Sequence, residues 1–346
     1  MLTVPCAARL ITLSESRMLA REVAEQAGLE LTPLEERRFE GGEFKLRPLE
    51  SVRGRIVFVL QCLAGTADAP VADRLLRLLL LLQGLRDAGA ERLVAVVPYF
   101  AFARKDRRTQ IRDPVTSRYV VELLEATGLH RVIALDVHNA AALDNAFRVP
   151  FDHLTALPMM VDHYARQLAG AELAVASPDV GGIKRVQVFR ELLAARLGRA
   201  VEMAFIEKRR ALDVVSGGTL VGEVTGKTVI VLDDLSATGG TLVRAAAACR
   251  RAGAQAVHVA VTHAPVPSAI RKLIEAQDIS SALVTDSVGL PLGEAATPGA
   301  GGLGNSANKL TVLAVAPLLG AAIRRMLGGK PVAPLLERWP VPPDSP

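Results

Sequence analysis

Residues 229–254 read VIVLDDLSATGGTLVRAAAACRRAGA, and this stretch decides the fold class. An apolar run ends in Asp233 and Asp234, a Gly-rich turn follows, and a helical pattern starts at Thr241. A buried strand, a short turn and a helix in this order are typical of a parallel, doubly wound sheet, whose ligands bind at the carboxyl ends of the strands. The backbone N–H groups of the turn and the dipole of the helix predict a phosphate site here.

The candidate site in this stretch combines acceptors for hydroxyls with donors for phosphate. The two carboxylates are within reach of sugar hydroxyls or a metal ion, and two threonine hydroxyls add to the backbone donors of the turn. An Asp pair alone is equally typical of a solvated helix start, and the apolar strand before it and TGGT after it favour binding. The site residues are Asp233, Asp234, Thr238, Gly239, Gly240 and Thr241.

Strand and helix patterns alternate along most of the chain. The strands are apolar without clean alternation, which indicates parallel sheets covered on both faces. The predicted strands are 56–61, 93–97, 132–136, 173–177, 203–206, 228–233, 256–262, 283–285 and 310–315. The predicted helices are 14–27, 70–88, 115–126, 157–168, 183–197, 241–252, 268–276 and 317–327. The sequence therefore predicts an α/β protein with Rossmann-like, mainly parallel sheets.

The length of 346 residues favours two domains. A break near Val149-Pro150 predicts an N-terminal domain over 1–150 and a C-terminal domain over 151–315, followed by a Pro-rich tail over 331–346. Ser14 is expected to cap the first helix and Gly28 to end it, and Gly253 to end the helix after the TGGT turn.

The composition excludes several classes of protein. Half of the residues are apolar and 22% are charged, which is a globular composition. No apolar run has the ~20 residues of a membrane span, and no signal peptide is predicted. Three scattered cysteines indicate a reducing, cytoplasmic location without disulfides. The net charge of +5 comes without a nucleic-acid motif, so neither a membrane nor a nucleic acid is an expected partner.

Four further charged groups follow predicted strands. A basic loop, PYFAFARKDRRTQ (98–110), suits polyphosphate and adenine contacts. Paired cations in EKRR (207–210) suit a clamp that neutralises a transferred phosphoryl group. Each group has an ordinary alternative, namely a solvated basic loop, a structural histidine or an exposed charge run. The residues in question are Arg104, Lys105, Asp106, Asp136, His138, Asp179, Lys208 and Arg210.

Nine motifs together carry a resemblance to a known family. The sequence resembles ribose-phosphate diphosphokinase, also called phosphoribosyl pyrophosphate synthetase, from about Phe39 to about Leu327. The motifs occur in the family's order and approximate spacing: FEGGE, VVPYFAFARKDRR, LDVH, SPDVGG, EKRR, LDDLSATGGT, VTH, VTDSV and VAPLL.

The resemblance implies two type I phosphoribosyltransferase-like domains, the first completed by the C-terminal helix over 316–330. It implies ATP contacts through Arg104, Lys105 and Asp106, and adenine contacts from a neighbouring subunit through Phe39 and Glu43. His138 and Asp179 would bind magnesium and the ATP phosphates, and the resemblance also implies a catalytic role for His138. Ribose 5-phosphate would sit on Asp233 and Asp234 with its phosphate in 238–241, and Lys208 and Arg210 match the catalytic clamp.

The implied reaction moves the diphosphoryl group of ATP to the anomeric hydroxyl of ribose 5-phosphate, with Mg²⁺ as cofactor and a homo-oligomer, dimer or hexamer, as the working form. The sequence departs from the family at Gly41, where an Asp or Asn is usual, and at Ala237, where an Asp is usual. Two alternatives therefore stay open. One is a phosphoribosyltransferase that consumes phosphoribosyl pyrophosphate. The other is a catalytically weak subunit that assembles with a genuine synthetase.

Overall fold

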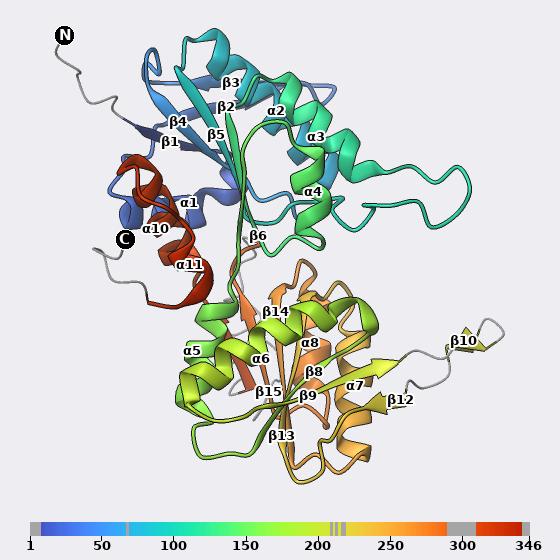
Figure 1. The fold of residues 1–346 in the computed structure, drawn as a ribbon. Helices are drawn as coiled ribbons and strands as arrows, with labels where there is room; N and C mark the ends of the chain where they lie inside the picture. Colours follow the sequence, from blue (N-terminus) through green and yellow to red (C-terminus); the bar gives the residue numbers. More distant parts are fainter. Residues whose placement is uncertain are drawn as a thin grey trace. The chain divides into compact units, whose positions relative to one another are not determined.

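The computed structural model describes residues 8–66, 69–207, 210–211, 214–215, 219–288 and 309–340. These residues fold into two compact units, each with its own sheet (Figure 1). The described part of unit 1 is 8–66, 69–155, 287–288 and 315–332, and that of unit 2 is 156–207, 210–211, 214–215, 219–286, 309–314 and 333–340. Each unit is therefore assembled from more than one stretch of the chain.

Unit 1 is built on a five-stranded sheet in the order β1-β4-β5-β6-β7 with all strands parallel. The strands are rich in Val, Ile, Leu and Ala, which suits burial on both faces of a parallel sheet. Their bounds are β1 (Arg9–Thr12), β4 (Ile56–Leu60), β5 (Arg92–Val97), β6 (Arg131–Leu135) and β7 (Phe151–Leu154).

Helices cover both faces of this sheet. Helices α1 and α10 pack against each other on one side, and α2, α3 and α4 lie on the other (Figure 1). The bounds are α1 (Arg17–Ala27), preceded by a 3-10 turn η1 (Ser14–Ser16), α2 (Val71–Asp87), α3 (Thr116–Ala126), α4 (Ala140–Ala146) and α10 (Ala316–Leu327). The contact between α1 and α10 is tight, because a Cβ added at Gly320 would lie 2.4 Å from Cβ of Gln26.

A separate antiparallel hairpin stands beside α2. It consists of β2 (Leu34–Arg38) and β3 (Phe44–Pro48), with Arg38 opposite Phe44. The turn between the strands contains Gly41 and Gly42 at φ of 88° and 92°, a region that favours glycine.

Unit 2 contains a seven-stranded sheet in the order β12-β9-β8-β13-β14-β15-β16, in which β12 alone is antiparallel to its neighbour. The bounds are β8 (Leu173–Ser177), β9 (Glu202–Glu207), β12 (Thr219–Val221), β13 (Thr228–Leu235), β14 (Ala256–His263), β15 (Ser281–Thr285) and β16 (Leu310–Leu313). A short hairpin, β10 (Arg210–Ala211) and β11 (Val214–Val215), lies between β9 and β12 in the chain.

The helices of unit 2 again lie on both faces of the sheet (Figure 1). Helices α7 and α8 cover one face over an apolar core of Ala, Val, Ile and Leu, and α5 and α6 pack together over the other. The bounds are α5 (Leu157–Gln167), α6 (Ile183–Leu197), preceded by a 3-10 turn η2 (Val180–Gly182), α7 (Gly240–Arg251), α8 (Pro267–Glu275) and α11 (Pro334–Glu337).

The predicted fold class is confirmed, and each predicted strand and helix is present within a few residues of its expected ends. Gly28 ends α1 at φ of 68° and Gly253 follows α7 at φ of 89°, as expected. The predicted cap at Ser14 is wrong, because its hydroxyl donates to Glu36 instead. The elements that the sequence did not predict are β1, the β2–β3 hairpin, β7, the β10–β11 hairpin, β12, α4 and the short helix α11 in the tail.

Within the described ranges, no helix is long and apolar enough to cross a membrane. Cys62 and Cys249 are buried free thiols, and burial raises the pKa of each to about 11.

Candidate active site

The acidic pair, Asp233 and Asp234, lies near the carboxyl end of strand β13, and both carboxylates contact one arginine. Arg185 on α6 places Nη1 3.1 Å from Oδ1 of Asp234 and 3.8 Å from Oδ1 of Asp233. The Asp234 side chain is 6% exposed and that of Asp233 is 20% exposed. Burial and the neighbouring negative charge of Asp234 raise the pKa of Asp233 well above its ordinary value, and Arg185 partly opposes this shift.

The Gly-rich turn places backbone donors next to this pair. Gly239 is the N-cap of α7 with φ of 71°, and no side chain caps the helix. The first N–H groups of an α-helix lack partners within the helix, and here they carry the positive end of the dipole as well. The hydroxyl of Thr241 lies 3.4 Å from Nη2 of Arg244. The turn therefore offers the amides and hydroxyl that a phosphate group requires.

Asp179 lies two residues after the end of the neighbouring strand β8, where it caps the 3-10 helix η2. Its Oδ1 accepts hydrogen bonds from the N–H groups of Gly181 and Gly182 at 3.0 and 3.3 Å. Strands β8 and β13 are paired, so this carboxylate and the acidic pair lie at the same edge of the sheet. Asp179 was predicted to be a metal ligand. In the structure its Oδ1 already accepts two backbone hydrogen bonds.

In unit 1, the basic loop after β5 is held by its own acidic residue. The ammonium group of Lys105 lies 2.8 Å from Oδ2 of Asp113, which also accepts from the Thr109 hydroxyl at 2.6 Å. These hydrogen bonds lower the pKa of Asp113 far below its ordinary value, and the bond from Lys105 makes the largest contribution. Arg104 is exposed at the surface of the same loop.

The loop after β6 joins the loop after β5. Asn139 Nδ2 donates to Asp106 at 2.6 Å, while its Oδ1 caps α4 through the N–H of Ala142. His138, next to Asn139, is exposed. Asp136 is buried at φ of 38°, and its Oδ1 accepts from the Thr155 hydroxyl at 2.6 Å. The structure thus brings Asp106 and the segment of His138 together at one edge of the sheet.

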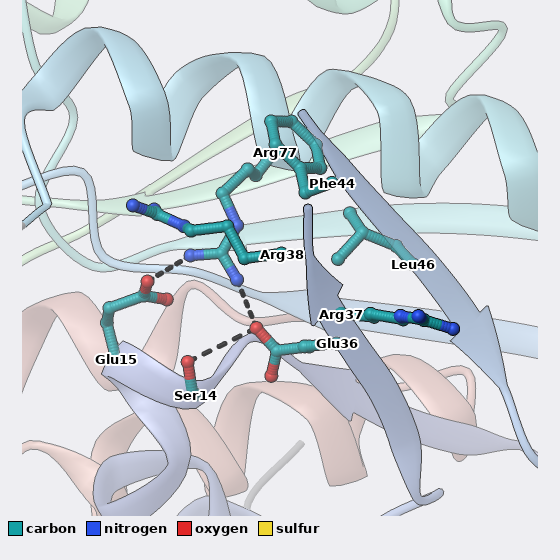
Figure 2. A pocket seen from close by; sticks show the side chains of 8 residues that line it. All are labelled: Ser14, Glu15, Glu36, Arg37, Arg38, Phe44, Leu46 and Arg77. Atoms are coloured by element: carbon teal, nitrogen blue, oxygen red, sulfur yellow. Dashed lines mark hydrogen bonds and ion pairs between the residues drawn. The ribbon is translucent and has the colours of Figure 1, made fainter. Parts of the chain in front are cut away.

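The β2–β3 hairpin carries Phe39 and Glu43 at its turn. The N–H of Phe39 donates to the Glu43 carbonyl at 2.7 Å, and the Phe39 ring is 41% exposed. The guanidinium of Arg37 lies 4.9 Å from the centre of that ring. A cavity of about 290 Å³ lies against the half of this hairpin next to its turn, and Figure 2 shows the side chains that line it. Its lining residues come from η1, the hairpin and α2: Ser14, Glu15, Glu36, Arg37, Arg38, Phe44, Leu46 and Arg77.

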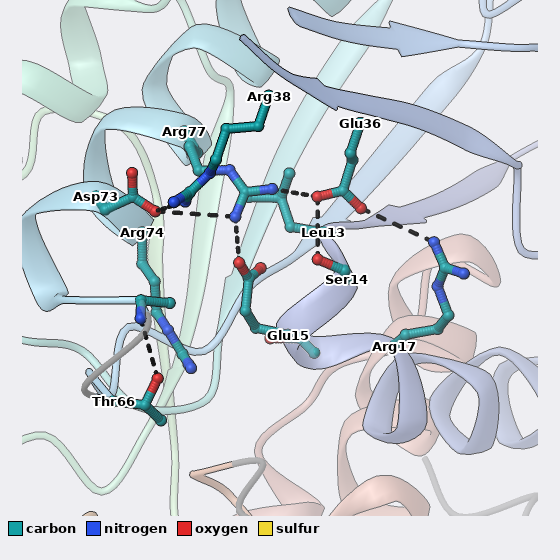
Figure 3. A network of polar contacts seen from close by, with 12 residues as sticks. Leu13, Ser14, Glu15, Arg17, Glu36, Arg38, Thr66, Asp73, Arg74 and Arg77 are labelled. Atoms are coloured by element: carbon teal, nitrogen blue, oxygen red, sulfur yellow. Dashed lines mark hydrogen bonds and ion pairs between the residues drawn. The ribbon is translucent and has the colours of Figure 1, made fainter. Parts of the chain in front are cut away.

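A buried ion-pair network ties the hairpin to α2 and η1 (Figure 3). Arg77 on α2 is 6% exposed and bonds both Glu15 of η1 and Glu36 of β2. Arg38 on β2 reaches Asp73 on α2 at 3.1 Å. These ion pairs therefore anchor β2 to α2 and η1 close to the hairpin turn.

The side chains of the two predicted clamp residues, Lys208 and Arg210, lie outside the described part of the structure. Lys208 lies outside the described residues. Arg210 begins β10, where its backbone pairs with Val215, and its side chain is also outside the described part.

Three basic residues near the site were not singled out from the sequence: Arg185, Arg244 and Lys272. Arg185 and Arg244 follow strand ends within the first helical turns, a position that could have marked them. Lys272 is on α8, after the next strand, so only the folded sheet brings it to the Gly-rich turn.

The residues expected to bind magnesium fit it in part. Among the described residues, no group of three or more His, Cys, Asp or Glu side chains is placed to hold a metal ion. Mg²⁺ commonly uses one or two carboxylates and completes its coordination with water and substrate phosphates. The carboxylate of Asp179 suits that role, whereas the imidazole nitrogen of His138 is a ligand that Mg²⁺ does not prefer.

Comparisons with known proteins identify relatives over nearly the whole chain. Residues 8–128 match the N-terminal domain of ribose phosphate pyrophosphokinase, and residues 152–286 match the phosphoribosyl transferase domain. The chain is 34% identical over 333 residues to ribose-phosphate pyrophosphokinase 1 of Streptococcus pneumoniae serotype 4, covering 95% of this chain and 97% of that protein. The corresponding protein of Streptococcus pyogenes serotype M1 is 33% identical with the same coverage.

A solved structure agrees with these matches. The crystal structure of phosphoribosylpyrophosphate synthetase from Mycobacterium smegmatis matches with a TM-score of 0.80 at 31% identity, covering 93% of this chain and 99% of that one. The family models together span more than half of the sequence, and the fold agrees over almost its full length. The chain belongs to the ribose-phosphate pyrophosphokinase family.

Proposed function

We propose that this protein transfers the diphosphoryl group of ATP to the anomeric hydroxyl of ribose 5-phosphate, forming 5-phosphoribosyl 1-pyrophosphate and AMP for nucleotide biosynthesis in the cytoplasm. The observation that carries the proposal is the acidic pair on β13 directly ahead of the phosphate turn, in a chain of this family. Asp233 and Asp234 would accept hydrogen bonds from ribose hydroxyls. The amides of Gly239 and Gly240 and the Thr241 hydroxyl would bind the 5-phosphate.

ATP would bind through the loops of unit 1. The cations Arg104 and Lys105 suit the triphosphate, and Asp106 is fixed beside them by Asn139. Phe39 and Glu43, on the anchored hairpin, would contact the adenine bound by a neighbouring subunit, so a homo-oligomer, dimer or hexamer, is part of the proposal.

In the reaction, the anomeric oxygen attacks the β-phosphorus, the bond to the α-phosphate oxygen breaks, and its electron pair leaves with AMP. Catalysis then depends on holding the groups in line and neutralising charge. Lys208 and Arg210 would provide cations at the transferred group, with His138 beside the phosphates. Magnesium, held by Asp179 and the phosphates, would add positive charge there when bound.

The proposal is tested by incubating the purified protein with MgATP and ribose 5-phosphate and measuring AMP, with Asp234→Asn as the control. AMP from the wild type and little from the variant supports it. In the same assay, Lys208→Ala is expected to lower kcat roughly 100-fold with smaller changes in KM, because the cation acts on charge that develops in the transition state. Unchanged turnover in that variant would contradict the role of Lys208.

A second candidate, a weak subunit that assembles with an active synthetase, is favoured by Gly41 and Ala237, which depart from the family pattern. Absence of AMP from the pure protein, together with co-purification of a related synthetase, would select it. Release of pyrophosphate from phosphoribosyl pyrophosphate and a nucleobase would select a phosphoribosyltransferase instead.

A further inference from the structure

Helix α8 lies directly against the phosphate turn and brings a lysine to it. A Cβ added at Gly239 would lie 2.9 Å from the Ala269 carbonyl oxygen, and 3.3 and 3.5 Å from Cβ and Cδ of Lys272. A Cβ added at Gly240 would lie 3.6 Å from Nζ of Lys272. The lysine stem therefore runs over Gly239, and the ammonium group ends beside Gly240, at the first residue of α7.

A second cation stands at the same place. Nη1 of Arg244 would lie 3.2 Å from a Cβ at Gly240, and its Nη2 is 3.4 Å from the Thr241 hydroxyl. Throughout the described part of the chain, no acidic side chain lies within ion-pairing distance of Lys272 or Arg244. Elsewhere in unit 2, Arg185, Arg166 and Arg196 are all paired with aspartates.

Two cations beside amide donors would repel one another less if an anion lay between them. The backbone of the turn can bind a phosphate group, but it carries only partial charge. A phosphate monoester near neutral pH carries close to two negative charges, and an ammonium group forms charge-assisted hydrogen bonds with it.

We propose that Lys272 is a direct ligand of the 5-phosphate of ribose 5-phosphate, with Arg244 as a second cation at the same group. This inference rests on the proposed function. It adds a side-chain ligand from α8 to a site otherwise made from the acidic pair and the turn. It also makes the site selective for a dianionic sugar phosphate over the free sugar.

The variant Lys272→Met tests the charge while keeping the stem that packs on Gly239. Its KM for ribose 5-phosphate should rise about tenfold, as for the loss of one hydrogen bond to a charged group, with KM for ATP and kcat nearly unchanged. Lys272→Arg should restore most of the affinity. Arg271→Met is the matched control, since it removes one exposed charge from the adjacent position of α8 and should leave both KM values unchanged.

Direct binding of ribose 5-phosphate to the full-length protein, measured by calorimetry at low and high salt, gives a second readout. Wild-type affinity should fall with salt more steeply than that of Lys272→Met, because one ion pair is missing in the variant. Equal affinities of Lys272→Met and Arg271→Met would overturn the role of Lys272.

The two proposals fail differently. If the wild-type protein binds ribose 5-phosphate but forms no AMP, the proposed reaction is overturned. The role of Lys272 is then still tested by comparing the affinities of Lys272→Met and Arg271→Met for ribose 5-phosphate. A wild type that binds no ribose 5-phosphate overturns both.

Discussion

At the scale of single residues, the acidic pair shows a conflict between binding and stability. Asp233 is held near a second carboxylate in a largely buried place, so its raised pKa means that the fold favours the protonated acid. Binding ribose hydroxyls calls for good acceptors, and therefore for the charged form. Ionising Asp233 in the ligand-free fold therefore costs more free energy than ionising it in the unfolded chain.

The variant Asp233→Asn separates these effects. Because the folded pKa lies above the unfolded value, the stabilising contribution is present below the ordinary pKa near 3.8 and is lost as the pH rises through the folded value. The ligand-free variant should therefore unfold at higher urea concentration than the wild type at about pH 8, with a smaller difference at about pH 5. It should also lose affinity for ribose 5-phosphate. A variant that is less stable at the higher pH would contradict this account.

Gly239 is required for a different reason, because its backbone is left-handed and its α-carbon faces a carbonyl of α8. Gly239→Ala should lower the free energy of unfolding by at least about 1–2 kcal/mol and abolish binding of ribose 5-phosphate. Gly253→Ala, at the other end of α7 and also at positive φ, should cost similar stability with binding intact. Urea unfolding and calorimetry on both variants check the pair. Retained binding in Gly239→Ala would show that the turn adapts.

At the scale of elements, the β2–β3 hairpin depends on one buried arginine. Arg77→Met should destabilise the protein by about 3 kcal/mol, since it removes the cation bonded to the mostly buried Glu15 and leaves Glu36 with Arg17 at 3.8 Å as its remaining cation. Arg38→Met, which breaks an exposed pair with Asp73, should cost less than about 1 kcal/mol. Chemical denaturation of the two variants and the wild type would measure both changes in the free energy of unfolding. Equal losses would mean that the buried network does not anchor the hairpin.

The sequence predicted some elements better than others, for physical reasons. Strands such as β8 and β13 are continuous apolar runs, and burial on both faces of a parallel sheet leaves that pattern. By contrast, β2 reads LEERR, and its charges are stabilised by partners on α2 and β3 that only the fold brings near. The strand could not be inferred from local hydrophobicity.

The candidate site likewise has a part that the sequence could predict and a part that only the fold brings together. The acidic pair and the turn are contiguous in sequence, so their proximity could be predicted. Arg185 and Lys272 reach the same edge from α6 and α8, which is a property of strand order rather than of spacing.

At the scale of the whole molecule, unit 1 is closed by α10, which comes from the far end of the chain and packs on α1. Gly320→Ala should destabilise the protein by about 1–3 kcal/mol, because the new methyl group meets the backbone of Gln26 and Ala27. Gly84→Ala on α2 is the matched control. It faces open space and should stabilise by up to about 1 kcal/mol through helix propensity. Thermal unfolding of both variants should shift in opposite directions.

The return of α10 also fixes an order of events during synthesis. A ribosome completes every strand of the unit 1 sheet by Leu154 but does not add the helix that covers α1 until Leu327. The part of α1 that packs on α10 must therefore stay uncovered while the whole sheet of unit 2 is made. Nascent chains halted anywhere between these points would expose that surface, and it is covered once α10 has emerged and packed on α1.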